Sequence, residues 1–293
     1  MNKLHLVYTP FTGVGLHNGY RGDEWYKYRI ELFKQTLLPS LRQQTNQNFI
    51  HWLSFRKEEK ENPLTKEFLQ YLIEIDYHFI VTFNGLIYRD DKFVVNWKGR
   101  FWNFGRVLRD CWRDKKINFK LFKEVLIDKN KTLPERLEVS LEGIKRFLQS
   151  QGIDKVEWIY LTRIDSDDMF HKLVIQELST LEPFEGALIF RNGLLYNINT
   201  GQLARWEPTT NPPFHTIMFP AKIFFDVEKH LAYMKDFKTH EEIPRIFRTK
   251  QLPNGRYCVG VHSKHISTIW NHPFRGKEFD QKDIKSIMVN FIG

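Results

Sequence analysis

The order of apolar and polar positions predicts an alternation of strands and helices over the first 85 residues. Short apolar runs indicate buried strands, and longer stretches with apolar residues every three or four positions indicate helices with one buried face. The elements predicted in this way are strands at 4–8, 49–55 and 77–83 and helices at 25–44 and 63–75. Pro39 should kink or divide the first helix, and Pro63 suits the first turn of the second. This β-α-β-α-β order is typical of a parallel sheet covered by helices.

The second half of the chain continues the alternation after a less regular stretch. The predicted elements are a helix at 133–149, a strand at 156–161, a helix at 174–181, a strand at 187–190 and a hairpin at 192–209. Strand 156–161 is almost wholly apolar, so we expect it near the centre of the sheet. Residues 85–132 are rich in Trp, Arg and Lys and predict an insertion. We therefore expect an α/β protein with a mostly parallel, Rossmann-like sheet flanked by helices, in a single domain spanning 1–293.

The composition excludes several classes of protein. Hydrophobic residues make up 42% and aromatic residues 15% of the 293 residues, too much for a largely disordered chain. No apolar run approaches the roughly 18 residues that a membrane-spanning helix needs, and the polar N-terminus predicts a first strand rather than a signal peptide. Cys111 and Cys258 are far apart, which excludes a disulfide framework or a four-cysteine zinc site. These features favour a cytoplasmic protein.

The charge is positive, with 44 Lys+Arg against 35 Asp+Glu, or +9. Such an excess suits a nucleic-acid surface, an anionic membrane surface or a site for phosphorylated substrates. The positive residues are dispersed along the chain, and no Lys/Arg block or basic tail is present in the sequence. We therefore rank a solvated surface first, a phosphate-bearing ligand second and nucleic acid third.

The sequence most informative about chemistry follows the predicted central strand. Three carboxylates, Asp165, Asp167 and Asp168, stand within four residues after it. Ligand sites in open α/β sheets lie beyond the carboxyl ends of the strands, and a divalent cation relieves the repulsion between close carboxylates. Oxygen ligands suit Mg²⁺ or Mn²⁺, which can hold a diphosphate. The alternative is that Asp167 or Asp168 caps the next helix, which would explain one carboxylate but not three.

Two sequence segments together resemble a known family. Residues 37–45 (LLPSLRQQT), followed by NFIHWL at 48–53, pair with TRIDSDD at 162–168. This combination resembles glycosyltransferases of the GT-A fold, and especially a rhamnosyltransferase family related to the family 2 transferases. The resemblance spans roughly residues 4–85 and 155–270, and leaves the predicted insertion poorly covered.

The resemblance implies a site for a nucleotide-sugar and its metal. Asp165 would contact the ribose, Asp167 the metal and its diphosphate, and Asp168 would be a further ligand. The remaining residues implied for the nucleotide-sugar are Tyr8, Thr9, Arg21, Arg163 and Lys264. A third metal ligand in such enzymes often comes from a late segment, where His262 is the first choice and His265 the second. A surface position for Arg21 and a structural role for either histidine remain open.

The resemblance also implies a base and an acceptor contact. An inverting transferase needs a carboxylate to take the proton of the acceptor hydroxyl. Glu241 and Glu242 stand where the family places acidic residues, with Glu241 favoured, and His240 is the candidate for acceptor binding. Both glutamates also suit an ordinary first helical turn.

The function expected from these residues is transfer of a hexose, with rhamnose suggested by the family name alone, from a UDP or dTDP sugar to a glycan, lipid-linked or protein acceptor. Mn²⁺ or Mg²⁺ would be the cofactor, nucleic acid is not an expected partner, and a lipid-linked acceptor would bring the protein to a membrane surface. Two alternatives stay open. One is a metal-dependent phosphodiesterase or nuclease, which usually needs more His and Asp ligands. The other is a non-catalytic nucleic-acid- or carbohydrate-binding protein, for which no recognition motif is seen.

Overall fold

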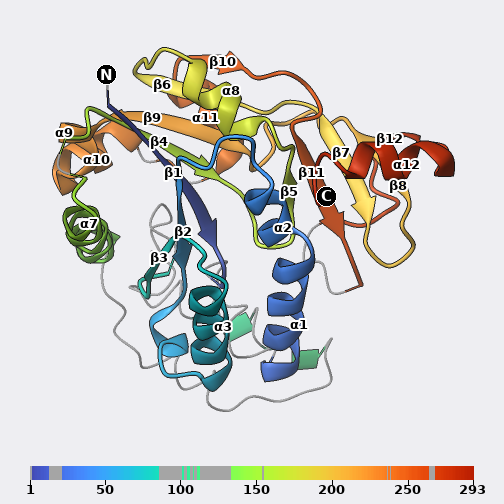
Figure 1. Ribbon diagram of the computed structural model, residues 1–293, viewed down its shortest axis with the longest axis horizontal. Coiled ribbons are helices and arrows are strands. Elements are labelled where there is room, and N and C mark those ends of the chain that lie inside the picture. The colour runs from blue at the N-terminus through green and yellow to red at the C-terminus, as the bar shows by residue number, and fades with distance from the viewer. Residues whose placement is uncertain are drawn as a thin grey trace.

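The computed structural model describes residues 2–12, 22–85, 133–153, 155–235, 239–263 and 268–293, together with 101, 104–105, 108, 111–112 and 237. The described chain is a mixed α/β structure with a seven-stranded and a five-stranded sheet (Figure 1). The predicted insertion at 85–132 lies almost wholly outside the described residues.

The larger sheet has the strand order β10-β6-β9-β4-β1-β2-β3. Its strands are β1 (Lys3–Pro10), β2 (Ile50–Ser54), β3 (Phe79–Thr82), β4 (Trp158–Arg163), β6 (Gly186–Ile189), β9 (His215–Pro220) and β10 (Thr249–Gln251). Strands β1 to β4 are parallel, as the β-α-β pattern predicts, and β10 is parallel to β6. Strand β9 is antiparallel to both β4 and β6, so the sheet is mixed rather than mostly parallel throughout.

The smaller sheet has the order β12-β8-β7-β11-β5. Its strands are β5 (Met169–Phe170), β7 (Gly193–Asn197), β8 (Leu203–Trp206), β11 (Tyr257–Val261) and β12 (Arg275–Glu278). The hairpin predicted at 192–209 is present as β7 and β8, which pair antiparallel. The sheet itself was not predicted, because β5, β11 and β12 come from distant parts of the sequence.

Helices cover both faces of the larger sheet. The described helices are α1 (Gly22–Gln35), α2 (Leu37–Arg42), α3 (Pro63–Glu74), α7 (Leu133–Ser150), α8 (Val174–Thr180), α9 (Ala221–Phe224), α10 (Val227–Met234), α11 (Ile243–Ile246) and α12 (Gln281–Met288), with 3₁₀ turns η2 (Lys57–Glu59) and η3 (His240–Glu242). The predicted helix at 25–44 is divided at Thr36, shortly before Pro39, into α1 and α2. The helix α3 begins at Pro63 behind an Asn62 cap, as predicted for its first turn.

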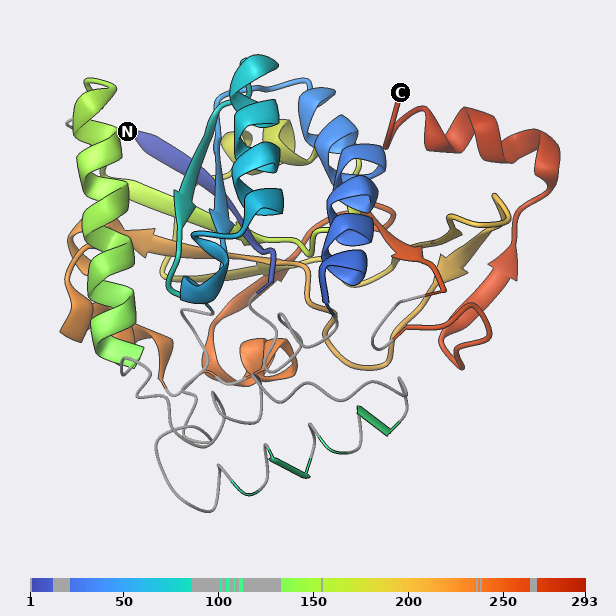
Figure 2. The same ribbon diagram turned by 90° about the horizontal axis from the view of Figure 1, so that it is seen from below.

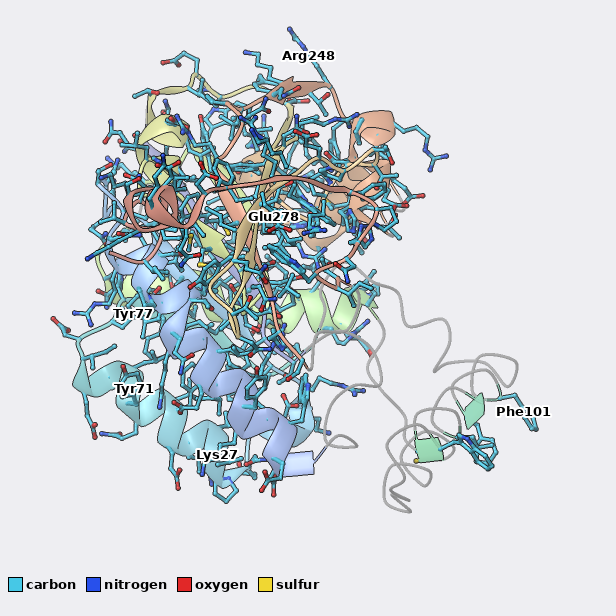
Figure 3. All side chains as sticks on the ribbon, turned by 90° about the vertical axis from the view of Figure 1, so that its right-hand side faces the viewer. Lys27, Tyr71, Tyr77, Phe101, Arg248 and Glu278 are labelled. Carbon is cyan, nitrogen blue, oxygen red and sulfur yellow. The ribbon has the colours of Figure 1, made fainter. Side chains whose placement is uncertain are left out.

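Successive side chains of β1 pack into two separate hydrophobic cores. Val7 packs with buried residues of α1, α2, α3 and α8, and Leu6 and Tyr8 pack with those of α7, α10 and α11. This alternation follows from the period of two along a strand. Figure 2 shows α1 and α3 side by side, with α7 at the opposite end of the molecule from α12. Charged side chains such as Lys27 on α1 and Arg248 before β10 are exposed at opposite ends of the view in Figure 3.

Candidate functional site

The three aspartates follow β4 at the place where the direction of the strand order changes. From β1 the chain proceeds to β2 and β3 on one side, whereas β4 pairs with the other side of β1. Residues Tyr8 and Arg163 are partners at the carboxyl ends of β1 and β4, and the Ile164 N–H donates to the Tyr8 carbonyl at 3.1 Å. A change of strand order of this kind is the usual ligand site of an open α/β sheet. The central position predicted for strand 156–161 is confirmed, although the strand starts at Trp158.

Asp167 is the point where three distant segments meet. Its Oδ2 atom accepts a hydrogen bond from Nη1 of Arg29 on α1, and lies 3.0 Å from Nε2 of His262, which directly follows β11. All three side chains are buried, and the ring of Tyr28 lies edge-on against His262 with 5.4 Å between ring centroids. The structure therefore brings together two of the predicted metal ligands, Asp167 and His262.

Asp168 is held by the backbone of β11. Its Oδ1 atom accepts a hydrogen bond from the Gly260 N–H at 3.0 Å. Burial is the largest cause that raises the pKa of Asp168 well above its usual range, and the neighbouring carboxylates of Asp167 and Asp165 raise it further.

Gly260 allows an unusually close approach between β11 and the aspartate loop. A Cβ atom at this position would lie 2.1 Å from the carbonyl oxygen of Asp167, which no side chain could accommodate without moving the backbone. The glycine therefore lets β11 lie close to the aspartate loop, and His262, two residues after Gly260, contacts Asp167 there.

Asp165 lies in a second group of polar residues beside the first. Arg163 donates from Nη2 to its Oδ1 atom at 3.1 Å. Burial is the main cause that lowers the pKa of His240, and the positive charge of Arg163 contributes, which places His240 within electrostatic range of this pair. His215, the β9 partner of Arg163, is also buried, and its pKa is lowered well below the usual range by burial first and by Arg163 second. Arg163 therefore couples electrostatically to both histidines as well as pairing with Asp165.

The two glutamates have different surroundings. Glu242 accepts the Thr239 N–H at 3.2 Å and pairs with Arg245 at 2.9 Å, so its carboxylate caps η3. Glu241 is exposed and lies within electrostatic range of His240. Glu241 is the one whose carboxylate is not needed for the cap.

Of the other residues implied for the nucleotide-sugar and its metal, some lie within the described part of the structure and some do not. Tyr8 is buried with its ring 4.8 Å from that of Trp52, and Thr9 is buried with its Oγ1 atom 2.9 Å from Nε2 of His51. Both side chains therefore contact the interior of the protein. Arg21, Lys264 and His265 lie outside the described residues.

The proposed capping role of Asp167 or Asp168 is wrong. The residues after them form β5, and α8 begins only at Val174, with Leu173 as its cap position. Both aspartates instead contact residues far away in sequence, which an ordinary helix cap would not require.

Arg29 is the residue of this site that sequence reasoning missed. It stands one helical turn after Trp25 and one turn before Phe33, both of which are buried on the inner face of α1. An arginine in an apolar stripe indicates a buried anionic partner. That signal is present in the sequence, but the partner is 138 positions away.

The described residues offer only part of a cation site. None of their His, Cys, Asp and Glu side chains gather in groups of three or more that could hold a metal by themselves. Asp167 and His262 supply one carboxylate and one imidazole, and Mg²⁺ in particular is usually bound by one or two carboxylates with substrate phosphates and water completing its shell. Asp167 and His262 could thus supply two ligands of a cation, and the remaining ligands would have to come from a bound molecule and water.

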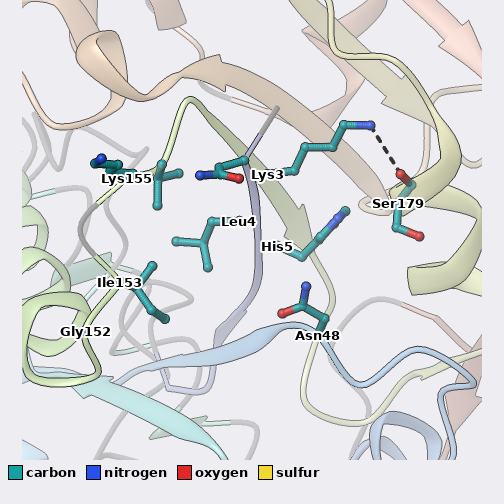
Figure 4. A pocket seen from close by; sticks show the side chains of 10 residues that line it. Lys3, Leu4, His5, Asn48, Gly152, Ile153, Lys155 and Ser179 are labelled. Atoms are coloured by element: carbon teal, nitrogen blue, oxygen red, sulfur yellow. Dashed lines mark hydrogen bonds between the residues drawn. The ribbon is translucent and has the colours of Figure 1, made fainter.

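A hollow of about 730 Å³ lies at the other end of the larger sheet (Figure 4). It is lined by residues at the start of β1, among them Lys3, Leu4 and His5, and Lys3 donates there to the carbonyl of Ser179 at 3.2 Å. This contact neutralises the carboxyl end of α8, and the hollow is remote from the aspartates in the sheet.

No family model matches this chain, and no curated protein matches it. Among solved structures, it is similar to a protein provisionally named a nucleotide-diphospho-sugar transferase from Desulfovibrio desulfuricans G20. The identity is 12% and the TM-score 0.32, over 87% of this chain and 81% of the other. Within the described residues, no helix has the length and apolar character of a membrane span.

Proposed function

We propose that this chain is a metal-dependent glycosyltransferase of the GT-A type, acting on a nucleoside-diphosphate sugar. The observation that carries the proposal is the position of Asp165, Asp167 and Asp168 at the strand-order change, with His262 brought to Asp167 from a distant strand. Acidic residues clustered at this position, two of them buried, are expected to face a cation and its anionic ligand.

In this proposal, Asp167 and His262 hold Mn²⁺ or Mg²⁺, which stabilises the negative charge that develops on the leaving diphosphate. Asp168 is a further candidate ligand, because a cation would compensate the burial of its charge. Asp165, oriented by Arg163 at 3.1 Å, is the candidate for the ribose hydroxyls. The positive charge of the chain, +9, favours an anionic donor of this kind.

Glu241 is the proposed base that deprotonates the acceptor hydroxyl, in an inverting reaction. Its exposed carboxylate is free of the capping contacts that occupy Glu242, and the neighbouring His240 is the proposed acceptor contact. The family resemblance suggests a UDP or dTDP hexose donor, rhamnose among them, and a glycan, lipid-linked or protein acceptor. The proposed enzyme is cytoplasmic, and it contacts a membrane peripherally when its acceptor is lipid-linked.

The proposal is tested by incubating the protein with UDP-, dTDP- and GDP-sugars and Mn²⁺ and measuring release of the nucleoside diphosphate, with water taking the sugar in place of the acceptor. We expect release from one nucleotide class, abolished by EDTA and by Asp167→Asn. Release of a nucleoside monophosphate instead would support the phosphodiesterase alternative, because a different bond would then be broken. A folded protein that cleaves none of the donors and binds none of them would contradict the proposal.

A further inference from the structure

The guanidinium of Arg29 lies against Asp167, one of the proposed metal ligands. It donates to the same Asp167 oxygen that His262 contacts. The side chain is buried, as are Trp25 and Phe33, one helical turn before and after it on α1. Its Nε atom is buried and has no hydrogen-bond partner among the described residues, so one donor of the guanidinium remains unused. A buried donor without a partner is costly unless a ligand supplies the acceptor.

A cation at Asp167 and the guanidinium of Arg29 compete for one carboxylate oxygen. Both are positive, and in a buried site their mutual repulsion is screened little by water. Binding of the cation must therefore weaken the contact between Arg29 and Asp167. The displaced guanidinium then needs another anion close by, and the diphosphate that the cation carries is the anion the proposed function supplies.

We infer that Arg29 has two partners in turn: Asp167 in the protein without ligand, and the diphosphate of the donor once a cation occupies Asp167. This inference rests on the proposed function. Arginine presents a planar fork of N–H donors that matches phosphate oxygens, and lysine does not. Arg29 thereby stabilises Asp167 before binding and adds a second positive charge to the leaving diphosphate during the reaction.

The inference is tested by measuring Mn²⁺ binding alone, from the electron paramagnetic resonance signal of free Mn²⁺, and then binding of UDP, dTDP and GDP at saturating Mn²⁺. The variants are Arg29→Gln and Arg29→Lys. Arg256→Gln is the matched control, because Arg256 forms a half-buried pair with Glu177 at the far end of β11 from His262. It removes one arginine–carboxylate pair without touching the candidate site.

In Arg29→Gln, Mn²⁺ should bind about tenfold more tightly than in the wild type, because the competing cation is gone, and the nucleoside diphosphate about tenfold more weakly. Arg29→Lys keeps the charge, so Mn²⁺ affinity should stay unchanged while the nucleotide binds several-fold more weakly. Arg256→Gln should change neither affinity.

Unchanged affinities in folded Arg29→Gln, beside a wild type that binds both ligands, would overturn this inference alone. Should Arg29→Gln fail to fold, unchanged nucleotide affinity in Arg29→Lys would overturn it equally. A folded wild-type protein that binds neither Mn²⁺ nor any of the nucleotides would overturn the proposed function itself.

Discussion

The backbone N–H of Gly260 donates to the Asp168 carboxylate at 3.0 Å, in a place where a Cβ on Gly260 would lie 2.1 Å from the Asp167 carbonyl oxygen. Strand β11 is therefore in direct contact with the aspartate loop. We expect Gly260→Ala to push the two apart, lowering the free energy of unfolding by about 1–3 kcal/mol and weakening Mn²⁺ binding. Urea denaturation and Mn²⁺ titration measure the two effects.

Gly143 offers the matched control for this glycine. It lies inside α7, and a Cβ there would have no atom within 4 Å. Gly143→Ala should raise the free energy of unfolding by about 0.5–1 kcal/mol, because alanine favours a helix, and leave Mn²⁺ binding unchanged. Equal behaviour of the two alanine variants would mean that the close approach at Gly260 does not shape the site.

Removing the charge of Asp167 should destabilise the protein as well as its ligand complex. In Asp167→Asn the buried guanidinium of Arg29 loses its ion pair, which is expected to cost about 3 kcal/mol of unfolding free energy. Adding Arg29→Gln should recover part of that loss, because the unpaired charge is then gone as well. Asp226→Asn is the control, since this exposed cap of α10 keeps a capping side chain. If the losses of unfolding free energy in Asp167→Asn and Arg29→Gln simply add in the double variant, that result would argue against a buried pair between Arg29 and Asp167.

Stability should fall in mild acid because of His51. This side chain is fully buried between Thr9 and Tyr77, and burial lowers its pKa from 6.5 to about 3 (Tyr77 is marked in Figure 3). Below pH 6.5, His51 becomes protonated in the unfolded chain but stays neutral in the folded chain, because its folded pKa is about 3. The free energy of unfolding therefore decreases as the pH falls. Between pH 7.5 and 5 this group should account for about 2 kcal/mol.

The variant His51→Gln isolates this contribution. Glutamine keeps polar atoms beside Thr9 and Tyr77 but does not titrate, so its stability should depend less on pH over the same interval. Urea denaturation at several pH values makes the comparison. Parallel curves for the wild type and His51→Gln would show that His51 does not bear on acid stability.

The two glutamates should separate catalysis from capping. Glu241→Gln is expected to lower nucleoside-diphosphate release from the donor about 100-fold and to leave donor binding intact, because a proposed base acts only in the chemical step. Glu242→Ala should keep most of the activity and lose about 0.5–1 kcal/mol of unfolding free energy, because it removes the side chain that caps the Thr239 N–H. The reverse pattern would assign the base to Glu242.

Local patterns in the sequence predicted the first half of the fold well. The β-α-β-α-β order, the division of the helix near Pro39 and the central position of the apolar strand β4 all depend on short-range patterns, and the structure confirms them. The antiparallel strand β9 and the second sheet were not predicted, because their pairings join segments far apart in the chain. Periodicity carries no information about such partners.

The candidate site was predictable only in part, because some of its residues are neighbours in the sequence and others are far apart. Asp165, Asp167 and Asp168 are adjacent in sequence and follow an apolar strand, so their place in the sheet could be expected. The contact of Asp167 with His262 spans 95 positions and was reached through the family resemblance. The contact with Arg29 spans 138 positions and was not predicted, because the location of Arg29 in an apolar helix stripe indicates burial but not its partner.

The central claim, a nucleoside-diphosphate site that needs a divalent cation, is tested most directly by thermal shift. The wild-type protein is heated with UDP, dTDP or GDP, each with and without Mn²⁺, beside Asp167→Asn under the same conditions. We predict a rise in Tm with at least one nucleotide only when Mn²⁺ is present, and no such rise in Asp167→Asn. A folded wild-type protein whose Tm is unchanged by every nucleotide with Mn²⁺ would contradict the account.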